Sequence, residues 1–444
     1  MREGSLQAPT RHPIDWTNPD FIDAAKLDAE VRRQFDVCHG CRRCFNLCDS
    51  FPRLFDLVDA AGDAELHGVK SEDFKPVVDA CTLCDMCFMT KCPYVPPHPF
   101  NIDFPHLMLR YRAAEHAKHG TPFWEKQLTE TDRNGKLAGL APALANWGSA
   151  RDNKLTRPLL EKVAGVDQHA ELPKFHGETF VDRAAKTPPA RNAEAPAKAR
   201  KAVIFATCFA NYNNPDIGMA AHAVLAKNGV DVIVAYPGCC GMPQLEQGDL
   251  ARVSQDAKSI AKAMKRYIDE GRDVIAPVPS CGLMLKFEWP LLVPDDPDVK
   301  RLSQSTFDIS EYVVDIAKKE GLAPGLKPIE GGVALHLACH ARAQNMGAKG
   351  AEMLKLIPEN SVTVVERCSG HGGSWGVKKG NFAIATKFAG QTVERAANAN
   401  KAILSSECPL AGKHLAQGME SKGKPGVSAP HPIQIMAKSY GLVE

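Results

Sequence analysis

Residues 230–241 read VDVIVAYPGCCG, an apolar run that ends in two adjacent cysteines. Short apolar runs that are rich in β-branched residues and followed by Pro and Gly are typical of buried strands. Similar runs precede and follow it, KAVIFATC at 201–208 and RDVIAPVPSC at 272–281, with a helical pattern at 216–229. Each predicted strand is therefore followed by cysteine, and the strands alternate with helices.

The same order of elements recurs further along the chain, in GGVALHLACH at 331–340, SVTVVERCSGHGG at 361–373 and KAILSSECPL at 401–410. Equivalent cysteines are about 130 residues apart, which indicates an internal duplication. Alternating strands and helices predict a parallel sheet in each half, and the carboxyl ends of parallel strands meet at one edge. The candidate metal ligands at these edges are Cys208, Cys239, Cys240 and Cys281 in the first half, and Cys339, Cys368 and Cys408 in the second.

The composition excludes several classes of protein. The 444 residues suffice for about three domains, and 54 basic against 52 acidic side chains leave no positive field to attract nucleic acid. Because the sequence has neither the apolar segment of a secretion signal nor a membrane-spanning run, we expect a cytoplasmic protein. Fifteen cysteines, an odd number, favour metal ligation over disulfides in a reducing compartment. Isolated cysteines have a second interpretation, as small buried apolar residues.

Two dense cysteine runs precede the duplicated half, CHGCRRCFNLC at 38–48 and CTLCDMCFMTKCP at 81–93. Three thiolates two residues apart bind three corners of a [4Fe-4S] cubane, while the remote fourth binds the neighbouring cluster. The spacing therefore predicts two [4Fe-4S] clusters with crossed ligation. The ligands are Cys38, Cys41, Cys44 and Cys92 for cluster 1, and Cys81, Cys84, Cys87 and Cys48 for cluster 2.

Zinc is the competing interpretation of these runs, although zinc sites usually take two closely spaced ligands from each of two segments. Asp49 follows Cys48 where proline is usual, and one additional residue precedes Cys92. The pattern therefore indicates the clusters more strongly than it indicates the crossing.

The sequence divides into five parts. Residues 1–35 form a tail, expected to be disordered over 1–17, and a helix; 36–100 form a ferredoxin-type domain with two [4Fe-4S] clusters; 101–200 form a helical connector and a Pro- and Ala-rich linker; 201–320 and 321–444 form cysteine-rich domains 1 and 2. The ferredoxin-type part is too short and polar for a good hydrophobic core of its own. We expect an α+β fold overall, in which a small, mostly helical dicluster domain precedes a duplicated α/β domain with parallel sheets.

Several segments carry a resemblance to a known family. They are LPKF at 172–175, CFANYNNPDIG at 208–218, CCGMPQLEQG at 239–248, PSCGLMLKFEWP at 279–290, GHGGSWGVKKGNF at 370–382 and ECPLAGKHL at 407–415. Together with two ferredoxin motifs ahead of two cysteine-rich domains, they resemble the iron-sulfur subunits of anaerobic glycerol-3-phosphate dehydrogenase. More broadly, they are similar to the cysteine-rich CCG domains of heterodisulfide reductase and glycolate oxidase iron-sulfur subunits.

The family's fullest pattern is a Cys, a Cys-Cys-Gly and a C-x-x-C, whose five thiolates can hold a non-cubane cluster. In this sequence Val278, Ser369 and Ala411 stand where that pattern has cysteine. Four thiolates in the first half still suffice for a cubane or a zinc ion. The second half, with three, either recruits His340 or His371 as a further ligand or is a relic without metal.

The resemblance implies an electron-transfer subunit of an oxidoreductase of the respiratory-dehydrogenase type. It would take electrons from a partner flavoprotein dehydrogenase, or another redox protein, through the two [4Fe-4S] clusters and pass them to a quinone or a thiol/disulfide-type acceptor. The first alternative is a heterodisulfide-reductase-like enzyme, or a reductant in peroxide defence, with catalysis at the cysteine-rich domains. The second is a zinc-stabilised scaffold without redox function.

Residues 135–166 hold an apolar stretch that is too short to cross a bilayer and is followed by Trp147 and basic residues. One interpretation is core packing. The other is peripheral docking on the inner face of the cell membrane, which the resemblance favours.

Overall fold

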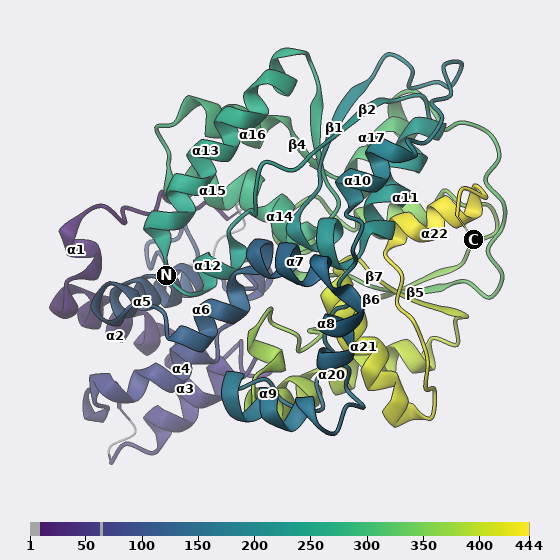
Figure 1. Cartoon of the computed structure of the whole chain (residues 1–444). Helices are drawn as coiled ribbons and strands as arrows, with labels where there is room; N and C mark the ends of the chain where they lie inside the picture. The colour runs from purple at the N-terminus through teal and green to yellow at the C-terminus, as the bar shows by residue number, and fades with distance from the viewer. Residues whose placement is uncertain (1–8, 63–64, 444) are drawn as a thin grey trace.

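The computed structural model describes residues 9–62 and 65–443, in which helices surround two parallel sheets (Figure 1). The first sheet has the order β2-β1-β3-β4 and the second the order β6-β5-β7. The strands are β1 (Lys201–Phe205), β2 (Asp231–Ala235), β3 (Asp273–Ala276), β4 (Thr306–Asp308), β5 (Val333–His336), β6 (Val362–Val365) and β7 (Ile403–Ser406). The expected fold class is confirmed, and β4 is an addition that sequence analysis did not predict.

The first sheet is covered on both faces, as its continuous apolar strands require. Val203 and Phe205 of β1 belong to one apolar cluster with α13 and α16, whereas Ala202 and Ile204 belong to another with α11 and α17, because successive side chains alternate between faces. The helices of this half are α10 (Phe180–Lys186), α11 (Pro215–Lys227), α12 (Met242–Glu246), α13 (Leu250–Asp269), α14 (Pro279–Leu283), α15 (Trp289–Leu292), α16 (Pro297–Ser305) and α17 (Ile309–Lys319), with π-helical turns η4 (Phe209–Asn213) and η5 (Met284–Glu288).

The second sheet repeats this plan with fewer elements. Val333 and Leu335 of β5 pack with α19 and α22, and Leu404 of β7 packs with α20 and α21 on the other face. The helices are α18 (Cys339–Ala343), α19 (Lys349–Lys355), α20 (Asn381–Asn398), α21 (Pro409–Met419) and α22 (Pro432–Ser439), with 3₁₀ turns η6 (Trp375–Val377) and η7 (Glu420–Lys422). Helix α22 also packs against α11, so the end of the chain joins the two halves (Figure 1).

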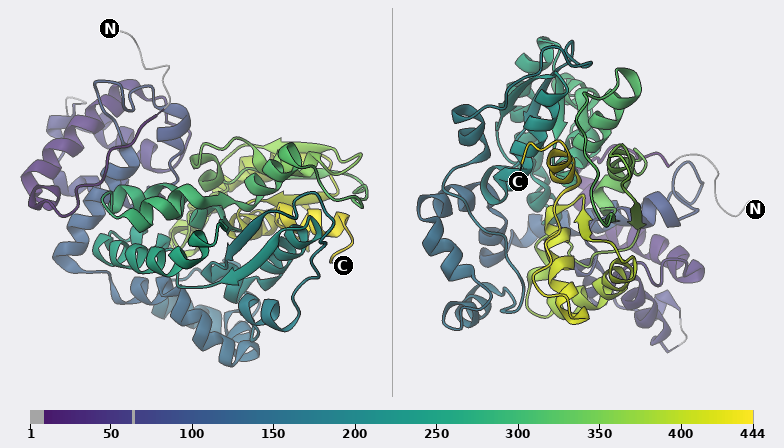
Figure 2. Two further views of the ribbon diagram at one scale, coloured as in Figure 1. Left: turned by 90° about the horizontal axis from the view of Figure 1, so that it is seen from above. Right: turned by 90° about the vertical axis from the view of Figure 1, so that its right-hand side faces the viewer.

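The N-terminal part is mostly helical and lies at the opposite end of the molecule from α22 (Figure 2). Its elements are α1 (Pro19–Ile22), α2 (Ala24–Cys41), α3 (Ser50–Asp59), η1 (Leu66–Gly68), η2 (Ser71–Phe74), α4 (Lys75–Asp79), η3 (Cys87–Lys91) and α5 (Phe104–His119). The ring of Phe104 packs against Phe51 at 4.6 Å and Phe35 at 5.8 Å between centroids, and this cluster continues to Trp289 in the first half. The N-terminal part, which is too small for a hydrophobic core of its own, thus shares the core of the first half.

Arg11 stands at the junction of these parts. Its guanidinium contacts Asp85 at 2.7 Å, Asp103 at 3.0 Å and Glu288 at 3.1 Å, and its side chain is 12% exposed. His106 contacts the second oxygen of Glu288 at 3.1 Å. Burial alone would raise the pKa of Glu288, but the charges of His106 and Arg11 bring it down to about 2. One buried cation therefore ties the tail, the dicluster part and the first half together.

Disorder was expected over residues 1–17. Residues 1–8 lie outside the described residues, and for the rest that expectation is wrong. Besides Arg11, the backbone N–H of Ile14 donates to the carbonyl of Leu291 at 2.8 Å, and Trp16 Nε1 donates to that of Leu292 at 2.9 Å. The described part of the segment has no helix or strand, and both backbone and side-chain hydrogen bonds hold it against the rest of the protein.

The connector is helical, as expected, in α6 (Phe123–Thr129), α7 (Thr131–Leu140), α8 (Pro142–Ser149) and α9 (Thr156–Ala164). Asp132 fixes α7 to the first half by accepting hydrogen bonds from the hydroxyls of Tyr212 and Tyr236, at 3.0 and 2.9 Å. Lys378 of the second half forms an ion pair with Glu125 of α6 at 2.8 Å. Among the described residues, no helix has the length and apolar character that crossing a membrane requires.

We predict that Arg11→Ala lowers the free energy of unfolding by about 3–5 kcal/mol, because it leaves three carboxylates near the core without their cation. The matched control is Arg301→Ala, since the exposed side chain of Arg301 pairs with the exposed Asp269 and its loss should cost at most about 1 kcal/mol. Urea unfolding of the metal-loaded protein measures both. Equal losses in the two variants would contradict the role given to Arg11.

Candidate metal centres

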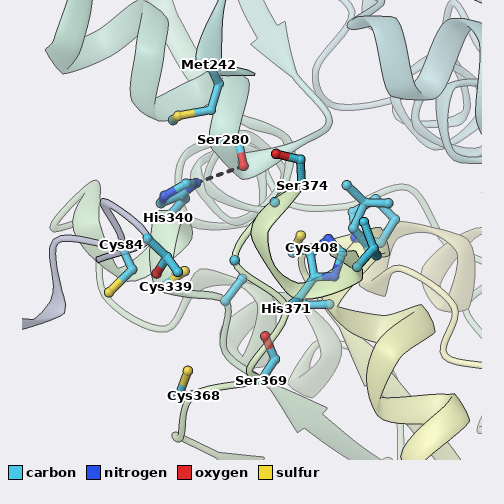
Figure 3. A pocket seen from close by; sticks show the side chains of 18 of the residues that line it. Cys84, Met242, Ser280, Cys339, His340, Cys368, Ser369, His371, Ser374 and Cys408 are labelled. Carbon is cyan, nitrogen blue, oxygen red and sulfur yellow. Dashed lines mark hydrogen bonds between the residues drawn. The ribbon is translucent and has the colours of Figure 1, made fainter. Parts of the chain in front are cut away.

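The parallel sheets bring the predicted ligands of each half to the carboxyl ends of their strands. Cys208, Cys239 and Cys281 follow β1, β2 and β3, and Cys339, Cys368 and Cys408 follow β5, β6 and β7. All of these, with Cys240 and also Cys84 from the ferredoxin-type part, line one cavity of about 1220 Å³. Figure 3 shows part of its wall. The sequence predicted a convergence within each half, but not that both halves and the dicluster part would face the same cavity.

The four cysteines of the first half form a compact hydrogen-bonded group. The Sγ atoms of Cys208 and Cys239 are 3.7 Å apart, and Thr131 Oγ1 lies 3.6 Å from Cys239 Sγ. Trp289 Nε1 donates to the carbonyl of Cys240 at 3.0 Å and so fixes the paired-cysteine turn. Gly241 completes that turn at φ +81°, a conformation that favours glycine.

These hydrogen bonds distribute charge unequally among the thiols. The bond from Cys208, supported by Cys240, holds the pKa of Cys239 well below its ordinary value. The same bonds, with burial, raise the pKa values of Cys208 and Cys240 well above theirs. Cys239 is therefore the thiol of this group whose pKa its neighbours lower. Several thiolates can be stable together at this buried position only if a cation binds to them, as a metal ion does in a metal centre.

The second half brings its three thiols beside the ferredoxin-type part. Cys368 Sγ accepts a hydrogen bond from the N–H of Gly370 at 3.3 Å. Burial raises the pKa of Cys339, and the charges of Cys84, Cys368 and Cys408 add to the rise. The three predicted ligands of this half are thus neighbours of one another and of Cys84.

The two candidate histidines of this half differ in their partners. His340 Nδ1 pairs with Ser280 Oγ at 2.8 Å, drawn as a dashed line in Figure 3, and its Nε2 lies 3.3 Å from the carbonyl of Leu83. Since Nε2–H donates to that carbonyl, Nδ1 accepts from the serine. His371 also lines the cavity, and its Nε2 is buried without a hydrogen-bond partner. Only His371 of these two therefore has a lone pair to offer.

The three positions where the family pattern has cysteine and this sequence does not are also found at the cavity. Val278, Ser369 and Ala411 all line it. Each of these three differences from the family pattern therefore replaces a thiol in the wall of the cavity.

The first predicted cubane site corresponds to a second, small cavity. It is lined by all four predicted ligands of cluster 1, with Phe51, Phe55 and Ile102 supplying apolar wall. For the second site, burial raises the pKa of Cys87 well above its ordinary value, and the charges of Cys84, Cys81, Cys44 and Cys48 raise it further. The remote cysteine of each run therefore lies beside the other run, as crossed ligation requires.

Burial is the main cause of raised pKa values throughout both sets. The pKa of the Cys92 thiol reaches about 11, and the pKa values of Cys44 and Cys84 reach about 12. Thiolates at these positions need positive charge within the protein, and iron ions supply it in iron–sulfur clusters. The donor set, the burial and the cysteine-lined cavity fit such clusters. Across the described ranges, no three His, Cys, Asp or Glu side chains converge as the ligands of a single metal ion do.

The four sets of thiols adjoin one another. Between sets, charge on one cysteine adds to the effect of burial in raising the pKa of another. The pairs are Cys44 with Cys87, Cys368 with Cys84, and Cys281 with Cys408. These pairs connect the thiols of cluster 1 to those of cluster 2, cluster 2 to the second half, and the second half to the first.

Glycines allow the loop of the second half to approach its surroundings closely. Gly370 has φ +71°, and a Cβ there would lie 2.0 Å from the carbonyl oxygen of Ala385 in α20. A Cβ on Gly372 would lie 2.5 Å from Thr82, beside the second cysteine run. The loop therefore sits between α20 and the dicluster part.

The connector contributes residues that sequence analysis did not assign to the site. Thr131, at the start of α7, reaches Cys239 although the two are 108 positions apart. Leu172, Pro173 and Phe175 of the LPKF segment line the cavity, so the resemblance at that segment was the one available signal. The contact of Thr131 arises from tertiary packing, which no local pattern encodes.

The comparisons with known proteins agree with this construction. A family model described as "Cysteine-rich domain" (CCG) matches residues 202–286 and again 333–415. The chain therefore contains this CCG domain twice, which confirms the duplication.

The particular relatives are similar over longer stretches. A fumarate reductase (CoM/CoB) subunit of Methanothermobacter marburgensis is 24% identical over 396 residues, covering 84% of this chain and 75% of the relative. A subunit of the anaerobic glycerol-3-phosphate dehydrogenase of Escherichia coli K12 is 24% identical over 315 residues, covering 70% and 76%. Lactate utilization protein A of Bacillus pumilus is 29% identical over 189 residues, covering 40% and 75%. The first two names describe subunits of a reductase and a dehydrogenase.

We predict that Gly370→Ala destabilises the protein by at least about 1–3 kcal/mol, because alanine must adopt a left-handed conformation and displace the Ala385 carbonyl. The matched control is Gly390→Ala in α20, where nothing lies within 4 Å of the added methyl, and alanine should stabilise by about 0.5–1 kcal/mol. Urea midpoints of the two variants measure the difference. Similar midpoints would contradict the close approach of the loop.

Proposed function

We propose that this protein is an iron–sulfur electron-transfer subunit of a dehydrogenase or reductase complex. The observation that carries the proposal is the series of four adjoining thiol sets, which runs from the N-terminal part to the cavity between the duplicated halves. The names of the relatives as subunits of a reductase and a dehydrogenase support it. A flavoprotein dehydrogenase, or another redox protein, is the proposed electron donor.

In this proposal Cys38, Cys41, Cys44 and Cys92 hold one [4Fe-4S] cluster, and Cys81, Cys84, Cys87 and Cys48 hold the other. A further cluster, or zinc, occupies the thiols of the cysteine-rich domains. When bound, the clusters supply reversible one-electron chemistry. The chain's own residues bury the ligands, exclude water with Phe51, Phe55 and Ile102, and hold the centres at fixed separations.

The cavity is the proposed place where electrons leave. Apolar side chains from the connector and basic side chains from the second half, such as Arg342 and Arg367, line it together with the thiols of both halves. A quinone or a thiol/disulfide-type compound fits such a wall.

The same observation favours the second candidate, a heterodisulfide-reductase-like catalyst or peroxide-defence reductant that acts in the cavity. Reduction of the acceptor that survives Cys240→Ser would count against catalysis at the first half.

We further propose that the connector docks on the inner face of the cell membrane. Leu140 is 84% exposed, Leu155 79% and Leu144 66%, and Trp147 is 56% exposed. The connector also carries exposed basic side chains, namely Lys126, Arg133, Lys136, Arg151, Lys154 and Lys162. Of these, Lys136 pairs with Asp132 and Arg151 with Glu420. The acidic side chains are mostly paired with the protein body, as Glu125 is with Lys378 and Glu130 with Arg252. Apolar residues among outward cations suit an anionic lipid surface.

The expected metal content tests the main proposal. Anaerobically purified protein should contain about eight irons for the two cubanes, with more if a further cluster is present, and reduction by dithionite should give cubane EPR signals. Quinone analogues or disulfides should reoxidise it. Zinc without a redox signal would refute electron transfer, and reduced clusters that neither compound reoxidises would refute the proposed acceptor.

The crossed ligation is tested by the remote cysteines. Cys48→Ser should alter the EPR signal of the cluster held by Cys81, Cys84 and Cys87, and Cys92→Ser the signal of the other, because each remote thiol lies beside the opposite run. If each substitution instead altered the cluster of its own run, the crossing would be wrong.

Membrane docking predicts flotation with vesicles that contain phosphatidylserine or phosphatidylglycerol, and little with neutral vesicles. The triple variant Leu140→Glu, Leu144→Glu and Leu155→Glu should lose most of this binding, since it places anions at the interface. Leu356→Glu is the matched control, because Leu356 is 36% exposed outside the connector. Unchanged flotation of the triple variant would remove the connector as the docking surface.

A further inference from the structure

The second half is short of ligands by its own sequence. Cys339, Cys368 and Cys408 supply three thiolates at the cavity, whereas a [4Fe-4S] cluster has four corners to bind. A fourth ligand is needed only if this half holds a cluster, so the inference rests on the proposed function. The fourth ligand must come from a side chain that lines the cavity and has an atom free to bind the cluster.

Three histidines among the described residues line the cavity, and their hydrogen bonds separate them. His336 Nδ1 lies 2.9 Å from Ser406 Oγ and its Nε2 lies 3.0 Å from the carbonyl of Arg367. Both nitrogens of His340 are likewise engaged, by Ser280 and the carbonyl of Leu83. His371 differs, because its Nε2 is buried and has no partner. Native proteins rarely leave a buried donor or acceptor without a partner, so its occurrence at a thiol-lined cavity points to a ligand.

His371 belongs to the same short loop as one of the thiols. Cys368 and His371 flank Ser369 and Gly370, and Ser369 is the position where the family pattern has its second cysteine. His371 and Cys408 both line the cavity and are labelled in Figure 3. The loop is fixed at Cys368, whose carbonyl accepts from Thr392 Oγ1 at 2.5 Å. The imidazole is thus displaced by two positions from the absent thiol.

We propose that His371 Nε2 is the fourth ligand of an iron–sulfur cluster held by Cys339, Cys368 and Cys408. A neutral imidazole in place of a thiolate makes the centre one charge less negative, and histidine ligation raises the reduction potential of iron–sulfur centres. The second half would therefore hold a centre of higher potential than an all-thiolate one. This places an electron acceptor next to Cys84 of the second cubane.

His414 is the competitor within this neighbourhood. Its ring centre lies 6.1 Å from that of His371, and its Nε2 is also buried without a partner. It is absent from the residues that line the cavity, which is why the proposal assigns the bond to His371.

The experiment uses the full-length, anaerobically purified protein, grown with and without ¹⁵N-labelled histidine. Pulsed EPR of the reduced protein should show a directly bound imidazole nitrogen whose coupling changes with the label. His371→Ala should abolish that coupling and remove about four irons per chain, and His371→Cys should restore the iron while lowering the midpoint potential of one centre. His340→Asn is the matched control and should leave both the coupling and the iron content unchanged.

The outcomes separate this inference from the proposed function. Loss of the coupling in His414→Ala but not in His371→Ala would overturn the assignment. Wild-type protein with only about eight irons and no nitrogen coupling would also overturn it, yet would leave electron transfer through the two cubanes intact. Protein without iron would refute the proposed function itself.

Discussion

Burial of sulfur ligands is the constraint on which the rest of this structure depends. The thiols of both cysteine runs and both halves lie in places where burial and neighbouring cysteines raise most of their pKa values, as at Cys87 and Cys339. Two or more thiolates in one set are unfavourable there unless a cation is bound. Binding of metal and folding of these loops are therefore coupled, and each loop is built to present sulfur rather than to pack by itself.

Burial of the sulfur ligands also requires that the N-terminal part and the two halves pack against one another in a fixed arrangement. Electron transfer needs constant distances between the centres. Three features fix the packing of the parts: the apolar core that joins Phe104 to Trp289, the buried Arg11 between three carboxylates, and helix α22, which contacts both halves. None of these is a flexible hinge. The arrangement suits a conductor of electrons better than an enzyme that must open and close around a large substrate.

Local patterns were sufficient to predict six of the seven strands, the duplication and the thiols, because strand periodicity and cysteine spacing are properties of short segments. They were insufficient for contacts that depend on tertiary packing. Arg11 looked like part of a polar tail, Thr131 like part of a connector, and nothing placed Cys84 at the cavity of the duplicated half. The choice between His340 and His371 also needed the structure, since it depends on hydrogen bonds to Ser280 and Leu83.

The two halves differ in their thiols in a way that would give the proposed series of centres a direction. The first half has four thiols, and among them Cys239 is hydrogen-bonded to both Thr131 and Cys208. The second half, beside the proposed cubanes, has Ser369 and Ala411 where the family pattern has cysteine, so it offers fewer thiolates to a metal centre. A less negative centre accepts an electron more readily. In the proposed function, electrons that arrive from the two cubanes would therefore meet the more favourable acceptor first, and the cavity between the halves is the proposed place where a molecule takes them away.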